Sequence, residues 1–515
     1  MESPVHNVGA WLARRAASGG DRLAVVDDAR RLDYRTLHER TSRCAALLSR
    51  RGVGRGDRVG LLLTNRSAYL ELVFAAAQLG AMAVPVNARL TAREVAIILA
   101  DCAPRVLVHE ASLAPVAEKA CAGAGSPLRI ACGGAADEYE AGLDEVEPLR
   151  HVEPVSPDHP MLLMYTSGTT GQPKGALLPQ RKTLYNSLNA QLFFDLTRED
   201  RVLVALPLFH SFGLSILALP TLYAGGSLIL QSRFDPHSVW QAVDREGVTF
   251  FGGVPTQFQR LLELLEAGPA GRYDLGSLRF LFTAGAAASP ALVRSFQRHR
   301  LLLKQGFGQT ETSILCCLDA RDAIRKAGSV GRPVFHAEVR VVTRTSVELE
   351  PADWRDAAVG ETGEIVVRGP ITMLGYWNRP EATAQTLRGE WLRTGDLASV
   401  DDEGFISLVD RVRDMYVSGG ENVYPAEVEA VYAEHPAVAE IAVVASPDPR
   451  WGEVGLAYIV PAAGAGLDPD ALRAWGRERL AGFKLPKRFI EVRALPRTPS
   501  GKIQKHRLAG ANAAG

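Results

Sequence analysis

The chain has 515 residues, which is enough for two to four domains. It carries 58 Lys and Arg residues against 58 Asp and Glu residues, so its formal net charge is zero, which argues against a general nucleic-acid-binding protein. Hydrophobic residues make up 47% of the chain and charged residues 23%, as in ordinary soluble globular proteins. We therefore expect a folded protein of several domains with no nucleic-acid partner.

The six cysteines form neither a CxxC pair nor a Cys/His cluster with zinc spacing. This pattern is typical of free thiols in a reducing compartment, so we expect a cytoplasmic protein. Residues 1–27 lack the apolar segment of a signal peptide. Residues 202–232 contain no charged side chain, but their prolines and glycines favour strand, loop, helix and strand within a core over a membrane span. The sequence leaves peripheral contact with a membrane open.

The first 150 residues alternate helical and strand patterns. Leu37, Thr41, Cys44 and Leu48 share one face of a predicted helix. Short apolar runs predict strands at residues 59–63, 83–86, 106–109, 129–131 and 161–164. Strands that alternate with helices imply parallel sheets covered on both faces, and the same pattern returns from residue 202 to about 310.

The chain becomes richer in short strands between residues 339 and 409, which predicts a small β subdomain. Beyond a boundary near residues 410–414, a helix opened by Pro425 is followed by two strands and a second helix. We therefore expect a large N-terminal α/β domain over residues 1–412, with two α/β-sheet subdomains and a small β subdomain. A small mobile α+β domain is expected over residues 413–515.

The segment most informative about chemistry is Tyr165-Thr166-Ser167-Gly168-Thr169-Thr170-Gly171-Gln172-Pro173-Lys174-Gly175. Glycines allow a backbone to approach an anion closely, while hydroxyls and a lysine add donors and charge. A glycine-rich loop after a buried strand is a usual place to hold a triphosphate. The spacing differs from that of a Walker loop, which disfavours a GTPase-type protein.

Five further segments carry residues suited to catalysis or binding, although each is weak alone. They are Leu206-Pro207-Leu208-Phe209-His210, Gly306-Phe307-Gly308-Gln309-Thr310-Glu311, Arg393-Thr394-Gly395-Asp396, the stretch from Asp410 to Pro425, and Pro499-Ser500-Gly501-Lys502. We interpret the second as a glycine turn before an acid, the first as the end of a strand, and the third as a tight turn.

Together, in this order and with these separations, the six segments resemble the acyl- and aryl-CoA synthetases of the adenylate-forming superfamily. The superfamily also includes luciferases and peptide-synthetase adenylation domains. The resemblance runs from Asp27 to Leu508 and looks closest to bacterial fatty-acyl-CoA and chlorobenzoate-CoA ligases. It implies a ligase of the EC 6.2.1 type that uses ATP, Mg²⁺ and coenzyme A. A monocarboxylic acid would attack the α-phosphorus of ATP, pyrophosphate would leave, and the CoA thiol would then attack the acyl-adenylate.

The resemblance also implies roles for single residues in the first half-reaction. Glu311 would coordinate Mg²⁺ with Thr166 nearby, Asp396 would accept the ribose hydroxyls, and Lys502 would act in catalysis between the carboxylate and the α-phosphate. The remaining ATP-binding residues would be Ser167, Gly168, Thr169, Thr170, Lys174, Gly285, Ala286, Gly306, Phe307, Gly308, Thr310 and Arg411.

In the second half-reaction, the resemblance implies that the small domain rotates about a hinge at Arg413. Gly419 and Gly420 would then line a narrow pantetheine tunnel, with Trp451 beside the CoA path. His210 would be a gate between the acyl pocket and the thiol entrance. Two departures from the family are Phe307, where Tyr is commonest, and Gln180, where many relatives carry His.

The acid is expected to be apolar, with an alkyl chain or an aromatic ring. The residues expected at the acyl pocket are Phe212, Leu214, Phe251, Val254 and Ile314, and the three segments that supply them contain no Lys or Arg. A dicarboxylate such as malonate would need a buried cation, so it is disfavoured.

Four other classes of protein could share parts of this sequence pattern. An amino-acid-activating domain is disfavoured because residues 211–215 offer no acid for an ammonium group. A luciferase-like side activity and an acyl-AMP ligase that loads a carrier protein stay open, although the latter usually has an insertion that this chain lacks. A non-catalytic nucleotide-binding scaffold is remote because Lys502, Glu311 and Asp396 are intact. The sequence leaves open a monomer or a homodimer, as well as the pathway, for which we expect a role in fatty-acid metabolism.

Overall fold

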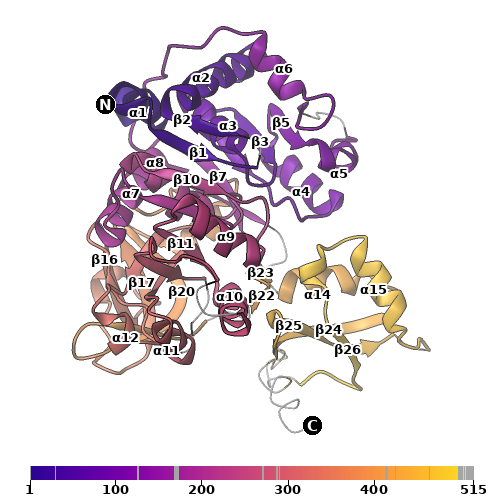
Figure 1. Cartoon of the computed structure of the whole chain (residues 1–515). Coiled ribbons are helices and arrows are strands. Elements are labelled where there is room, and N and C mark those ends of the chain that lie inside the picture. Colours follow the sequence, from indigo (N-terminus) through magenta and orange to yellow (C-terminus); the bar gives the residue numbers. More distant parts are fainter. Residues whose placement is uncertain are drawn as a thin grey trace. The chain divides into compact units, whose positions relative to one another are not determined.

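The computed structural model describes residues 2–28, 30–123, 127–166, 173–268, 272–285, 288, 290–411, 416–423, 425–462, 464–496, 503, 505 and 508, and only the backbone of residues 409–411, 422 and 426. The chain divides into two compact units. The first contains Met1–Ala88, Leu99–Tyr165 and Gly175–Asp410. The second contains Arg89–Ile98, Thr166–Lys174 and Arg411–Gly515. Figure 1 labels their elements.

A nine-stranded sheet forms the centre of the first unit, in the order β15-β14-β13-β12-β11-β9-β10-β1-β2. The strands from β13 to β1 are parallel, as the alternation of helices and strands predicted. Its strands are β1 (Leu23–Val26), β2 (Arg31–Asp33), β9 (Arg201–Val204), β10 (Ser227–Leu230), β11 (Phe250–Gly253), β12 (Phe280–Thr283), β13 (Leu303–Gln309), β14 (Ser313–Cys317) and β15 (Arg332–Pro333).

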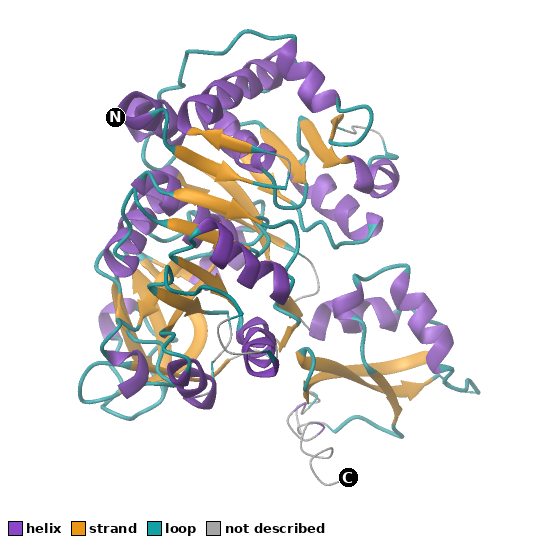
Figure 2. Ribbon diagram, viewed as in Figure 1, coloured by secondary structure: helices purple, strands orange, loops and turns teal. Residues whose placement is uncertain are grey.

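Hydrophobic cores lie on both faces of this sheet because alternate residues of its central strands, β9 to β12, enter different clusters. Phe280 and Phe282 of β12 belong to the larger cluster, whereas Leu281 between them packs in a second cluster with Trp240 and Phe258. The helices that contribute to the second cluster are α9 (Pro236–Glu246), α10 (Pro255–Ala267) and α11 (Pro290–Arg298). Figure 2 shows these helices beside the strands.

A seven-stranded sheet follows the order β18-β8-β7-β4-β3-β5-β6, and its pairs from β4 to β6 are parallel. Its strands are β3 (Arg58–Leu62), β4 (Met82–Pro85), β5 (Val106–Glu110), β6 (Leu128–Cys132), β7 (Pro160–Thr166), β8 (Lys174–Pro179) and β18 (Gly375–Tyr376). The helices along this part of the chain are α1 (Trp11–Gly19), α2 (Tyr34–Arg50), α3 (Ser67–Gln78), α4 (Ala92–Cys102), α5 (Ala114–Ala120), α6 (Glu138–Asp144) and α7 (Gln180–Phe194).

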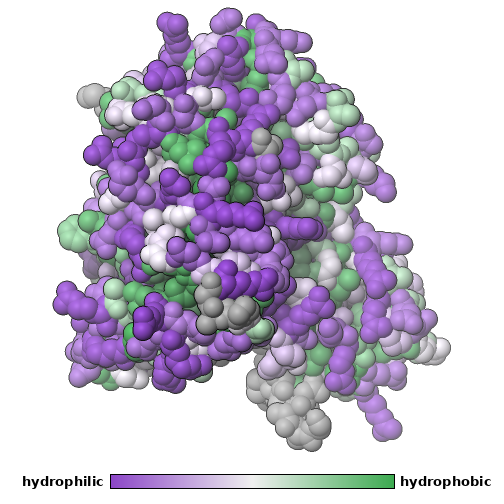
Figure 3. Space-filling model, in the orientation of Figure 1, coloured by the Kyte–Doolittle hydropathy of each residue, from purple (hydrophilic) through white to green (hydrophobic). Residues whose placement is uncertain are grey.

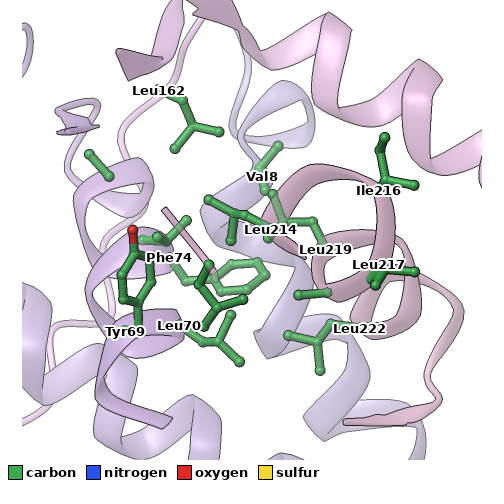
Figure 4. Packing of buried hydrophobic residues seen from close by; sticks show 14 of the residues in the cluster. Val8, Tyr69, Leu70, Phe74, Leu162, Leu214, Ile216, Leu217, Leu219 and Leu222 are labelled. Carbon is green, nitrogen blue, oxygen red and sulfur yellow. The ribbon is translucent and has the colours of Figure 1, made fainter. Parts of the chain in front are cut away.

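The charge-free segment at residues 202–232 folds as predicted into strand, loop, helix and strand. After β9 it forms the π-helix η4 (Phe212–Ala218), the helix α8 (Leu219–Ala224) and β10. Figure 4 shows how Leu214, Leu217 and Leu222 of this segment lie among Leu70 and Phe74 of α3 in the larger core. None of the described helices has the length and apolar composition needed to span a lipid bilayer.

An antiparallel sheet completes the first unit, which confirms the predicted small β subdomain. Its strands are β16 (Glu338–Thr343), β17 (Gly363–Arg368), β19 (Leu387–Arg388), β20 (Trp391–Val400) and β21 (Ile406–Arg411). The short helices along this part of the chain are α12 (Asp322–Arg325) and α13 (Pro380–Thr386).

The C-terminal part of the second unit is the expected α+β fold. Two helices, α14 (Pro425–Ala433) and α15 (Pro469–Arg477), contribute to a core with a five-stranded sheet. The strands are β22 (Tyr416–Ser418), β23 (Glu421–Val423), β24 (Val438–Asp448), β25 (Gly452–Pro461) and β26 (Arg488–Glu491). Pro425 opens α14 as its position in the sequence predicted. Hydrophilic side chains cover most of the molecular face visible in Figure 3.

Candidate active site

The glycine-rich segment follows a buried strand, as the sequence predicted. Strand β7 ends at Thr166, and the chain is described again from Pro173, directly before β8. The Thr166 hydroxyl donates a hydrogen bond to the carbonyl oxygen of Lys174 at 3.4 Å. The candidate phosphate-binding residues Ser167, Gly168, Thr169 and Thr170 lie outside the described residues. Strand β7 therefore ends where the candidate phosphate-binding loop begins. The binding role of that loop stays a prediction.

Glu311 lies in the short connection between the antiparallel strands β13 and β14. The hydroxyl of Tyr376 donates a hydrogen bond to Glu311 Oε1 at 2.8 Å, and the Met373 amide donates to the Glu311 carbonyl oxygen at 2.8 Å. The carboxylate is partly exposed, so it is oriented by a neighbour and still reached by solvent. Such a group suits a hard cation, which prefers oxygen ligands.

The glycines before Glu311 lie in a strand, so the predicted glycine turn is wrong. Gly306, Phe307 and Gly308 are part of β13, and the chain turns only at residues 310–312. A Cβ at Gly308 would lie 2.0 Å from the carbonyl oxygen of Ser313, and one at Gly306 would lie 2.7 Å from the Phe282 ring. These glycines permit close packing of the hairpin and of an aromatic ring, which sequence alone does not distinguish from a turn.

Asp396 also lies in a strand, β20, where the sequence predicted a tight turn. The pairing of β17 with β20 shifts its register between Arg393 and Leu397, and Gly395 in this interval has a φ of +71°. A glycine at an irregularity within a strand therefore produced a sequence pattern that also predicts a turn. The Asp396 side chain is 3% exposed and accepts a hydrogen bond from the Gln309 amide of β13. The structure thus brings together two of the six motifs.

The remaining ATP-binding candidates are only partly described. Gly285, directly after β12, has a φ of +85°, which favours glycine, and a Cβ there would lie 3.5 Å from Val254. Phe307 is 7% exposed, and Thr310 lies in the same turn as Glu311. Ala286 and the side chain of Arg411 lie outside what is described.

Four of the five candidate acyl-pocket residues divide between the two cores of the nine-stranded sheet, and Val254, which is 5% exposed, belongs to neither. Leu214 and Ile314 belong to the larger cluster, and the half-buried Phe212 packs against it. Phe251 belongs to the second cluster, where its ring stacks on Phe258 at a centroid distance of 5.5 Å. Phe251 therefore faces the opposite side of the sheet from Phe212. The pocket role of these residues stays a prediction.

His210 lies in the loop that follows β9, and Phe212 lies just beyond it. The strand ends at Val204, so the expectation that His210 ends a strand is wrong; Pro207 and Gly213 break the apolar run. The imidazole of His210 lies 4.9 Å from the Phe209 ring between centroids and is partly exposed. A Cβ at Gly252 would lie 2.8 Å from the Phe212 ring, so this glycine lets the ring pack on the sheet.

The described side chains also line an open hollow of about 180 Å³ elsewhere in the first unit. Its lining includes Asn189, Leu192, Cys317, Pro333 and Phe335 and none of the predicted site residues. Small-molecule sites usually enclose roughly 300–1,000 Å³, so this hollow is smaller than a usual substrate site.

Lys182 is a residue near the site that sequence reasoning missed. It lies on α7, is 1% exposed, and its ammonium donates a hydrogen bond to the Ser313 hydroxyl, two residues after Glu311. Burial lowers the pKa of Lys182 from 10.5 to about 7, while the charge of Glu311 opposes this shift and Arg181 adds to it. The one signal in the sequence was a lysine close behind the glycine-rich segment.

In the second unit, Gly419 and Gly420 form the two-residue turn between β22 and β23. Their φ values of +58° and +86° are those of a hairpin turn in which both central residues are left-handed. A Cβ at Gly419 would lie 2.8 Å from the ring of Trp451, which is 38% exposed. Two further candidates, Arg413 and Lys502, lie outside the described residues.

This fold and these motifs belong to a nucleotide-dependent ligase. The family model of the AMP-binding enzymes matches residues 12–377, and that of the AMP-binding enzyme C-terminal domain matches residues 427–502. The chain belongs to this family and to the adenylate-forming superfamily, which confirms the resemblance and the expected fold class. It is an AMP-forming acyl- or aryl-CoA ligase, an acid–thiol ligase that converts carboxylic acids into CoA thioesters with ATP and CoA as substrates.

The similar proteins differ in the acid that they are named for. Feruloyl-CoA synthase of Amycolatopsis is 44% identical over 97% of both chains. Long-chain-fatty-acid–CoA ligase FadD13 of Mycobacterium tuberculosis is 35% identical over 97% of both chains. A solved structure of o-succinylbenzoate CoA synthetase from Bacillus subtilis, bound to a product analogue, has 32% identity and a TM-score of 0.87 over 99% of both chains. The comparisons therefore establish the reaction class and leave the acid to be argued.

We expect Lys182→Met to change how stability depends on pH. Between the folded pKa of about 7 and the unfolded value of 10.5, the unfolded chain binds a proton that the folded chain does not. Stability should therefore rise with pH in this window, by at most about 1.4 kcal/mol per pH unit. Between pH 7.5 and pH 9, the thermal midpoint of Lys182→Met should rise by less than that of the wild-type protein. Equal gains in both proteins would contradict the lowered pKa.

Proposed function

We propose that the enzyme activates an apolar monocarboxylic acid, and that an aromatic acid is preferred over an alkyl one. The observation that carries this proposal is the chemistry of the pocket candidates: Phe212, Leu214 and Ile314 are all apolar and lie against one hydrophobic cluster. The relative at 44% identity is named for feruloyl-CoA, an aromatic thioester, which supports the aromatic choice. The buried cation Lys182 does not argue for a dicarboxylate, because it is engaged with Ser313 and is 1% exposed.

In the proposed adenylation step, the protein positions two anions that would otherwise repel each other. The Thr166–Lys174 loop would hold the β- and γ-phosphates, and Lys502 would lie between the acid carboxylate and the α-phosphate. Asp396, already oriented by the Gln309 amide, would accept hydrogen bonds from the ribose hydroxyls. Gly285, Ala286 and Phe307 would contact adenine, and Arg411 would contact ribose or phosphate.

Mg²⁺ is proposed to bind between Glu311 and the phosphates, with Thr166 nearby. The described donors fit this ion, since a partly exposed carboxylate and a hydroxyl are hard oxygen ligands. Bound there, Mg²⁺ would neutralise phosphate charge. Tyr376 contributes by orienting one carboxylate oxygen of Glu311.

For thioester formation we propose that the small domain, residues 413–515, rotates about Arg413. Gly419 and Gly420 would then border the pantetheine tunnel, Trp451 would lie along it, and His210 would gate the acyl pocket. The cytoplasmic location and the absence of a nucleic-acid partner stay proposals from the cysteine pattern and the net charge, and the oligomeric state is not assigned.

The proposed substrate class can be tested with a panel of acids. Pyrophosphate release should be fastest with hydroxycinnamate-like and other aryl acids, slower with medium alkyl acids, and slowest with acetate and malonate. Among alkyl acids each buried methylene should contribute about 0.8 kcal/mol to kcat/KM until the pocket is full. The measurement is kcat/KM for each acid with and without CoA, and a preference for malonate would overturn the apolar pocket.

Lys502→Ala should abolish adenylation because the attacking carboxylate loses its positioning cation. Thioester formation from supplied acyl-adenylate should stay nearly intact, since Lys502 is proposed to withdraw in that step. Single-turnover assays of the two half-reactions measure this difference. An equal loss in both would contradict the two-conformation proposal.

Gly420→Asn should slow CoA attack by an order of magnitude or more while it spares adenylation. Asparagine adopts the left-handed backbone that this turn requires, with a φ of +86° at Gly420, so it adds a side chain to the tunnel with little strain. Gly420→Leu is the matched variant, whose branched side chain strains the turn as well. If the CoA thiol attacks the acyl-adenylate at the normal rate in Gly420→Asn and only Gly420→Leu is impaired, the glycine serves the turn alone.

A further inference from the structure

The turn that carries Glu311 contains a strained backbone position. Ser313, the first residue of β14, has a φ of +62°, a conformation that side chains other than glycine and asparagine rarely adopt. Such a conformation persists only where its surroundings hold it, and it concentrates at functional sites. The question is therefore which contacts hold Ser313.

Two side chains one helical turn apart on α7 hold this segment. The Lys182 ammonium donates a hydrogen bond to the Ser313 hydroxyl. Asn186 accepts a hydrogen bond from the Ile314 amide at 3.2 Å and donates one to the carbonyl oxygen of Ser215 at 2.5 Å. Residues four apart lie on the same face of a helix, so both act from the same side. On the other side, Tyr376 and Met373 contact Glu311 itself.

Burying a lysine to donate to a serine hydroxyl costs more free energy than using an uncharged donor. Within the described part of the chain, the Lys182 ammonium donates a hydrogen bond to the Ser313 hydroxyl and forms no ion pair with a carboxylate. An ammonium that is removed from water without a paired carboxylate destabilises a fold, and an uncharged side chain of similar length is often better tolerated. Packing alone therefore does not account for a lysine at this buried position, where its described hydrogen-bond partner is a neutral hydroxyl.

We propose that Lys182 is a positioning residue for adenylation, which fixes the orientation of Glu311 through the hydroxyl of Ser313. This inference rests on the proposed role of Glu311. The lysine would act through the turn and not on ATP or the acid, so its loss should misplace the carboxylate, while Asn186 still holds the amide of the pocket candidate Ile314. Because a shift of about 1 Å in a positioned group can cost about a hundredfold in rate, a small movement of this turn is enough to be measured.

The test compares four variants: Lys182→Met, Ser313→Ala, the double variant, and Lys304→Met as a matched control. Lys304 is also buried, at 4% exposure, and donates to a neutral acceptor, the Phe193 carbonyl oxygen at 2.9 Å. It lies on β13 against the rings of Phe193 and Phe280, and it makes no described contact with the Glu311 turn. The control therefore removes a buried charge without touching the proposed link.

We expect Lys182→Met to lower kcat for adenylation by about tenfold or more, with KM for the acid nearly unchanged. Ser313→Ala should lower kcat in the same direction, and the double variant should be no slower than Lys182→Met, because both substitutions break one link. Calorimetry of Mg²⁺ with a non-hydrolysable ATP analogue should show weaker binding in Lys182→Met. Its thermal midpoint should be equal to or above that of the unchanged protein, and Lys304→Met should keep normal kcat.

The inference is overturned if Lys182→Met keeps normal kcat and nucleotide binding, or if the losses in the double variant add. If Lys182→Met does not fold, normal kcat in Ser313→Ala overturns it instead. These results differ from a failure of the proposed function, in which the unchanged protein releases no pyrophosphate with any acid of the panel.

Discussion

The nine-stranded sheet is buried on both faces, and this constraint decides where the described site residues of the first unit can lie. The apolar side chains of its central strands enter one of two hydrophobic clusters, and a polar side chain on these strands is itself buried, as Lys304 is on β13. The described candidates Gly285, His210 and Glu311 come from segments that follow strands: Gly285 after β12, His210 in the loop after β9, and Glu311 after β13. A site at the carboxyl ends of strands is the usual consequence of such a sheet.

The antiparallel pair β13 and β14 adds a second constraint at this edge. Its short connection forces Glu311 to project beside the sheet, and Gln309 at the end of β13 reaches Asp396 in the small β sheet. The end of β13 therefore holds Asp396 through Gln309, and two residues further on the chain presents the Glu311 carboxylate, which Tyr376 orients. The glycines of β13 make this possible, because a side chain at Gly308 would collide with the backbone of β14.

The sequence predicted the strands and the family well, and the particular contacts poorly. Short apolar runs such as residues 161–164 indicated buried strands because both faces of a parallel sheet are covered, so consecutive side chains of its strands are apolar. Glycines were ambiguous, since close packing in β13 and a bulge in β20 require them as much as a turn does. Phe251 and Phe212 look alike as apolar residues near the site, and only the alternation along β11 places Phe251 on the other face. Lys182 was missed because a charged residue in a polar helix is ordinarily exposed.

Helix α7 shows why the expectation that its charged residues are exposed was wrong for Lys182. Its buried face carries polar side chains, which bind backbone groups of other elements. Gln180 accepts from the Val8 amide at 2.9 Å, and Asn189 accepts from the His336 amide at 2.9 Å. Asn186 joins Ile314 of β14 to Ser215 of η4, so the helix clamps segments that come from distant parts of the chain. Hydrophobic periodicity cannot reveal such a helix, because its energy comes from hydrogen bonds in the interior, where an unsatisfied group is costly. The same clamp gives Lys182 its place, since a helix that already presents amides to the core can also carry an ammonium there, beside the strained backbone of Ser313.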